Sequence, residues 1–150
     1  KETPTMVSSE DKSQMIERIA RYNNASDRRD VEAHVAAYTE DGVITGGMGT
    51  TQNGKDGLRE ALPAMFEGEG TEKRHLASNH EFDEQGDDRV SVHYVLTVLE
   101  AGTSPGVVAT AGIVDSFVHT DGKWLVREHE ISIDPSFSFL AHPSESSGVM

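Results

Sequence analysis

The segment that decides the fold covers residues 89–100 and reads RVSVHYVLTVLE. Apolar side chains occupy every second position along its middle, at Val90, Val92, Tyr94, Leu96 and Val98. Because successive side chains of a strand point to opposite faces of a sheet, this period of two predicts a strand with one buried face. An antiparallel sheet of such strands needs a cover on one side, and helices elsewhere in the chain can supply it.

The segments that follow and precede it have a similar composition. Residues 73–82, 106–119 and 123–133 are rich in Val, Ile, Thr, Tyr and Phe, and turn signals separate them. Asp121-Gly122 is a strong hairpin signal, because glycine tolerates the positive φ of a tight turn. We therefore expect consecutive antiparallel strands here, and a further short strand at Val43–Thr45.

The first half of the chain has the periodicity of helices. Apolar positions spaced three and four apart predict an amphipathic helix over about 9–25 and another over about 56–66. A short helix between them carries Val31, Val35 and Tyr38 on one stripe. Helices followed by hairpin-linked strands indicate an α+β domain rather than a βαβ one.

Composition narrows the class of protein. The 150 residues suit one domain, which we place at 9–135, between a flexible leader (1–8) and a partly packed tail (136–150) with a disordered end. The 13 Lys and Arg against 26 Asp and Glu give a net charge of −13, which argues against nucleic acid and membrane surfaces as partners. Cysteine is absent, which excludes disulfides and thiolate sites. No apolar run reaches the ~20 residues of a membrane span and no secretory signal is recognisable, so we expect a cytoplasmic location.

Motifs for metal, nucleotide or serine-nucleophile chemistry are missing from the sequence. It lacks HExxH, GxSxG, the phosphate-binding P-loop and GxGxxG, so we expect no metal and no cofactor. Strand parity places His75 and His80 on opposite faces, and likewise Trp124 and His129. His34 is expected to be solvated. The chemistry that remains is acid–base catalysis by histidine and carboxylates.

A set of ordered motifs resembles the SnoaL-like proteins of the nuclear transport factor 2-like superfamily. The resemblance lies in residues 19–30, 38–42, 74–79 with its His-x-x-x-Asn pattern, 115–117 and 121–124. It implies a cystatin-like fold in which a curved antiparallel sheet wraps against the N-terminal helices to form a cone with an apolar pocket. The family often forms dimers or trimers, so the resemblance also implies a homodimer or homotrimer.

The nearest resemblance within the superfamily is to scytalone dehydratase and hexachlorocyclohexane dehydrochlorinase, which use a His–Asp pair. Carried over by position, the pair here is Asp27 and His75, and the polar residue of the last strand falls on or near His129. A lysine in the first helix of the dehydrochlorinase corresponds to a position near Tyr22 here, so the residue type differs. Ser26 stands where scytalone dehydratase has a tyrosine, so its tyrosine pair is not clearly reproduced.

The resemblance implies a cofactor-independent lyase, of the dehydratase or dehydrohalogenase type, for a small apolar, cyclic substrate. His75 would be the general base, since imidazole has a pKa of ~6.5, and Asp27 would orient it and balance its charge. Tyr22 and His129 would contact the substrate or its leaving group, and Met65 and Phe66 would exclude water.

Other interpretations stay open on the sequence. Asp27 can simply cap the following helix, and a strand histidine such as His75 can be structural. The whole domain can be a binding module for a small molecule or a protein without catalysis. It can also be an isomerase with Asp27 as the base.

Overall fold

The computed structural model describes residues 7–47, 49–70 and 72–140 of the chain, and side chains as far as residue 137. Its elements follow in chain order: α1 (Ser9–Arg28), α2 (Val31–Val35), β1 (Tyr38–Gly46), α3 (Gly54–Gly68), β2 (Lys73–Gly86), β3 (Arg89–Glu100), β4 (Val107–Thr120), β5 (Lys123–Ile133) and the 3-10 segment Pro135–Leu140. None of the described helices is long and apolar enough to cross a membrane. The predictions for residues 1–6 and 141–150 lie outside the described residues.

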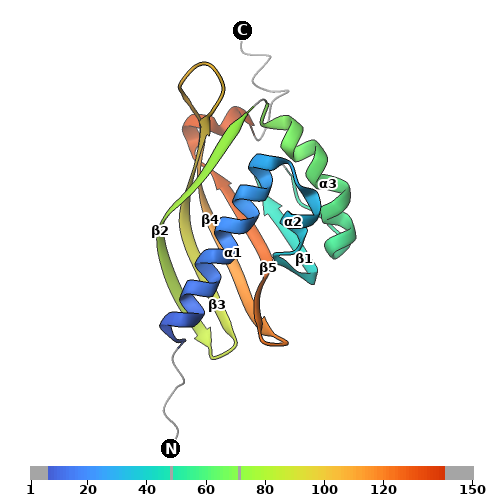
Figure 1. Cartoon of the computed structure of the whole chain (residues 1–150), viewed down its shortest axis with the longest axis vertical. Coiled ribbons are helices and arrows are strands. Elements are labelled where there is room, and N and C mark those ends of the chain that lie inside the picture. The colour runs from blue at the N-terminus through green and yellow to red at the C-terminus, as the bar shows by residue number, and fades with distance from the viewer. Residues whose placement is uncertain (1–6, 48, 71, 141–150) are drawn as a thin grey trace, which may run out of the picture.

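One five-stranded sheet, with helices on one face, makes up the α+β fold (Figure 1). Strands β2 to β5 form an antiparallel meander, and β1 adds to β5, giving the order β1-β5-β4-β3-β2. The β1–β5 pairing is parallel, so the prediction of a wholly antiparallel sheet is wrong at this edge. Only strands joined by hairpins must run antiparallel, and residues 47–122, about half of the chain, separate β1 from β5.

Helix α1 crosses the inner face of the sheet, the face that the helices cover (Figure 1). It begins with a capping box in which the Ser8 hydroxyl and the Asp11 carboxylate each accept a backbone N–H. The helix continues to Arg28, so Asp27 lies inside α1, and Asp30 is the residue that caps α2. The interpretation of Asp27 as a helix cap is therefore wrong. Val7 is buried and its N–H donates to the Glu84 carboxylate, so Val7 packs on the domain although the predicted leader (1–8) included it.

The other two helices differ slightly from their predicted bounds. α2 ends at Val35, and Tyr38 belongs to β1, where it is fully buried. α3 is longer than predicted and continues through Pro63. It packs along β1, and Gly57 is required there because a Cβ would come within 1.5 Å of the Gln52 carbonyl oxygen.

A β-bulge in β2 changes which face its histidines occupy. Ser78 pairs with Val95 and Glu81 with His93, so Asn79 and His80 together oppose a single residue of β3. Asn79 has a positive φ of 59°, a conformation that asparagine tolerates better than most residues. The bulge brings the His80 ring onto the buried Tyr94 ring, at 5.3 Å between centroids. The prediction that His75 and His80 face opposite sides is thus wrong, because an extra residue breaks the alternation.

A second bulge has the same effect in β5. Glu128 pairs with Ser116 and Val126 with Phe117, which leaves Arg127 as the extra residue. Trp124 and His129 are therefore both buried on the inner face, contrary to the parity prediction.

Candidate active site

Asp27 and His75 meet where the last turn of α1 lies against the start of β2. The Asp27 Oδ1 atom lies 2.6 Å from His75 Nδ1, and both carboxylate oxygens accept the His75 backbone N–H, at 3.0 and 3.3 Å. The two side chains are only 9% and 5% exposed, respectively. Asp27 thus fixes the ring orientation and holds a proton on Nδ1. The structure brings together the two residues that the resemblance paired.

The other ring nitrogen of His75 also faces a carboxylate. Glu69, which follows α3, places Oε2 2.9 Å from Nε2. Burial by itself lowers the pKa of His75, but the hydrogen bonds and charges of Glu69 and Asp27 outweigh it and raise that pKa above its ordinary value. An acceptor thus lies at each ring nitrogen, so both nitrogens are positioned to donate, which is the hydrogen-bonding pattern of an imidazolium. Glu69 was missed in the sequence, where it is one of several glutamates without a pattern.

A second carboxylate–histidine pair lies deeper in the same region. Asp115 Oδ1 is 2.6 Å from His129 Nδ1, and the Tyr22 hydroxyl donates to Asp115 Oδ2 at 2.5 Å. The Tyr22 hydroxyl also contacts the Tyr94 hydroxyl, and it lies 3.2 Å from His129 Nδ1. Asp115 is fully buried, and within the described residues no hydrogen bond engages His129 Nε2. This nitrogen is the one left for a ligand.

The tyrosines around Asp115 are held neutral. Burial first, and then the negative charge of Asp115, raise the pKa of Tyr22 and of Tyr94 well above the ordinary value of 10. Both phenols therefore remain hydrogen-bond donors at any physiological pH. Asp115 was missed as a site residue, although a carboxylate alternating with Ile113 and Phe117 on a buried strand face was an available signal.

His34 is buried, so the prediction that it is solvated is wrong. It lies on the same side of α2 as Val31 and Val35, and this stripe packs inward. The Ser26 hydroxyl donates to the Tyr22 carbonyl oxygen, so it accepts from His34 Nδ1, and the Tyr38 hydroxyl donates to Nε2. Burial lowers the pKa of His34 to about 3, which keeps the ring neutral.

These groups surround a cavity of about 130 Å³. Its wall is largely apolar and includes Met65 and Phe66, as expected, together with side chains of β3 and β5. A cavity of roughly 150 Å³ can hold benzene, so the present one suits a molecule of about one ring. Five of the expected site residues line it, namely Tyr22, Met65, Phe66, His75 and His129, while Asp27 stands behind His75. Among the described residues, no group of three or more His, Asp and Glu side chains is arranged to hold a metal ion.

Known proteins share this architecture. The family model described as SnoaL-like domain matches residues 7–130. A protein of unknown function with a cystatin-like fold from Nostoc punctiforme has a TM-score of 0.80 at 28% identity, with 88% of this chain and 97% of that chain covered. No curated protein sequence matches.

Two further solved structures share the fold at lower identity. LinA has a TM-score of 0.72 at 17% identity, covering 82% of this chain and 85% of its own. A candidate scytalone dehydratase from Novosphingobium aromaticivorans has a TM-score of 0.67 at 20% identity, covering 82% and 83%.

Proposed function

This chain belongs to the SnoaL-like domain family, and on that premise we propose that it is a cofactor-independent lyase acting on a small apolar molecule of about one ring. The observation that carries the proposal is the 2.6 Å contact of Asp27 with His75 at the wall of an apolar cavity. A buried carboxylate behind a cavity-facing imidazole is the arrangement of a general base. The name of one protein with a similar fold, the candidate scytalone dehydratase, is compatible with elimination of water.

The proposed reaction is an elimination. His75 Nε2 removes a proton from a carbon beside an activating group, the C–H electron pair forms a C=C bond, and the leaving group departs with its own bonding pair. Asp27 accepts the Nδ1–H and stabilises the imidazolium that forms, an interaction that is stronger in a dry cavity than in water. Positioned base catalysis of this kind supplies roughly 10²–10⁴ in rate.

The opposite polar group of the cavity suits the departing atom. His129 Nε2 is unengaged among the described residues, and His129 lines the cavity. When protonated, it can donate a proton to a hydroxide leaving group, so that water departs. Asp115 and Tyr22 hold the His129 ring in place from its Nδ1 side.

The carboxylate-base isomerase is less well supported by the geometry. Both oxygens of Asp27 already accept hydrogen bonds from His75, which leaves the carboxylate committed to the ring rather than directed at a substrate. A non-catalytic binding module would use the same cavity, so experiment has to separate it from the lyase.

The test is turnover of a panel of one-ring compounds that carry a hydroxyl or halide β to an acidic C–H. We expect His75→Gln to lower kcat by about 10²–10⁴, with ligand-induced thermal stabilisation retained. His93→Gln, at an exposed position of β3, is the matched control and should be unchanged. Full activity in His75→Gln would refute the role of His75, and stabilisation by ligands that are never turned over would favour the binding module.

A further inference from the structure

Beyond this function, on which it rests, we propose that Glu69 is the positioning residue that covers the base nitrogen of His75 before substrate binds and that exchanges protons between this nitrogen and water. The observation is that both ring nitrogens are bonded to carboxylates, with Glu69 at Nε2. A base needs an unprotonated nitrogen facing its substrate. A substrate that reaches Nε2 must therefore displace Glu69.

The two carboxylates are not equally able to leave the ring. Asp27 sits inside α1 and is bonded to both the ring and the backbone of His75, and its side chain is 9% exposed. Glu69 makes one contact with the ring and its side chain is 27% exposed. Side chains with few contacts and solvent access change rotamer most readily. Of the two carboxylates, Glu69 is thus the one that moves away from the His75 ring.

The backbone at Glu69 is anchored, so the movement is one of the side chain alone. The Gly70 carbonyl accepts a hydrogen bond from the Arg29 guanidinium at the end of α1. The Glu69 N–H and Gly70 N–H are bonded to carbonyls of the last turn of α3. The several rotatable bonds of the glutamate side chain can carry the carboxylate out to water without opening the helix end.

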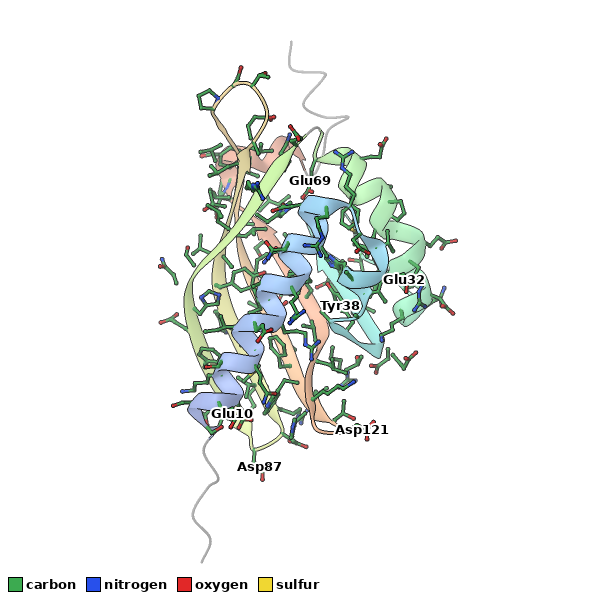
Figure 2. All side chains as sticks on the ribbon, in the orientation of Figure 1. Glu10, Glu32, Tyr38, Glu69, Asp87 and Asp121 are labelled. Atoms are coloured by element: carbon green, nitrogen blue, oxygen red, sulfur yellow. The ribbon has the colours of Figure 1, made fainter. Side chains whose placement is uncertain are left out.

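Glu69 has the position of an entrance residue. It lines the cavity together with His75, and it is the partly exposed member of the Asp27–His75–Glu69 set. Figure 2 shows it at the end of the molecule opposite the turns that carry Asp87 and Asp121. A molecule in the cavity and the Glu69 carboxylate therefore compete for the same nitrogen.

The proton balance follows from these contacts. As Glu69 leaves, its carboxylate takes the Nε2 proton, the ring becomes neutral, and the resulting carboxylic acid ionises in water. The neutral Nε2 then removes the substrate proton. When product departs, Glu69 returns to the protonated Nε2, and that proton leaves through Glu69 to water when the next substrate enters. One proton enters from the substrate and one leaves to solvent per turnover.

The electrostatic surroundings of His75 include few other groups. Asp27 faces it from α1 and Glu69 from the end of α3. His34 of α2 is neutral, because burial lowers its pKa to about 3. The opposing residue on β3 is the apolar Val98, and on its own strand Lys73 is paired with Glu100. Removing the charge of Glu69 is therefore the most selective way to change the pKa of His75.

The first experiment is an NMR titration of the His75 ring in the full chain, with Glu69→Gln compared to wild type. Removing the carboxylate should lower the midpoint of the His75 titration, because the charge that raises its pKa is gone. Glu67→Gln is the matched control, since it makes the same charge change at an exposed position of α3. Equal midpoints in Glu69→Gln and Glu67→Gln would overturn the proposal.

The second experiment is kinetic and uses any substrate that wild type turns over. Glu69→Ala should lower KM, since nothing has to be displaced, and should lower kcat by about tenfold or more, since the proton leaves only through water. The acid limb of the kcat/KM profile should move to lower pH. An unchanged kcat and KM would overturn the proposal. If no turnover is found, the lyase function fails, while the titration still decides whether Glu69 holds the proton on Nε2.

Discussion

The buried neutral His34 predicts a loss of stability in mild acid. Its pKa is lowered by burial to about 3 in the folded protein, whereas the unfolded chain has an ordinary imidazole at ~6.5. Below pH 6.5 the unfolded state binds a proton that the folded state does not, so stability falls as the pH falls. Between pH 7.5 and pH 5 this difference amounts to about 2 kcal/mol.

The assay is urea unfolding at several pH values in this range. His34→Gln removes the titrating ring, so its free energy of unfolding should fall by about 2 kcal/mol less than that of wild type over the same interval, whatever its stability at pH 7.5. His93→Gln, on the exposed side of β3, should keep the wild-type slope. The reasoning is refuted if His34→Gln and wild type lose the same free energy, since His34 would then take up protons equally in both states.

Three other predictions concern single side chains. The raised pKa of His75 stabilises the folded state below the unfolded value of ~6.5, and this stabilisation is lost as the pH rises through the folded value. Urea unfolding should therefore find His75→Gln more destabilising at pH 5.5 than at pH 8.5. The reverse order would contradict the contacts of His75 with Glu69 and Asp27. Tyr22→Phe removes a donor to the buried Asp115 carboxylate at nearly constant volume and should cost about 1.5–3 kcal/mol in urea unfolding, and a cost near zero would show that the hydroxyl is not bonded there. Gly57→Ala would place a Cβ within 1.5 Å of the Gln52 carbonyl oxygen and should lower the thermal midpoint, whereas an unchanged midpoint would mean that α3 begins differently.

The regular part of the fold was readable from the chain because its signals are local. The alternation through Val90–Val98 identified β3, and Asp121-Gly122 placed the β4–β5 hairpin. The parallel edge strand β1 was not readable in the same way, since its pairing with β5 depends on how the helices lie rather than on a turn. Tyr38 was placed in a helix because its spacing from Val31 and Val35 suits one, but tertiary pairing takes it into a strand.

In the candidate site, too, the residues that a sequence motif marks were found and those defined only by tertiary contacts were missed. Asp27 and His75 were found through a resemblance that spans the motifs around them, and their contact is present in the structure. Glu69 and Asp115 were not found, because their significance lies in which atoms they face across the fold and not in a sequence pattern. Strand parity failed for His80 and His129, since neither bulge is marked by a glycine or proline.

The bulge at Arg127 decides which side chain of β5 faces Asp115. Deleting Arg127 would leave Val126 opposite Phe117 and Glu128 opposite Ser116, with His129 still on the inner face. If β5 instead kept this residue and ran with uninterrupted alternation, every side chain beyond it would exchange faces, and Glu128 would take the place of His129 beside Asp115. A strand of the same composition without the bulge would thus set a carboxylate against a carboxylate where an imidazole now lies.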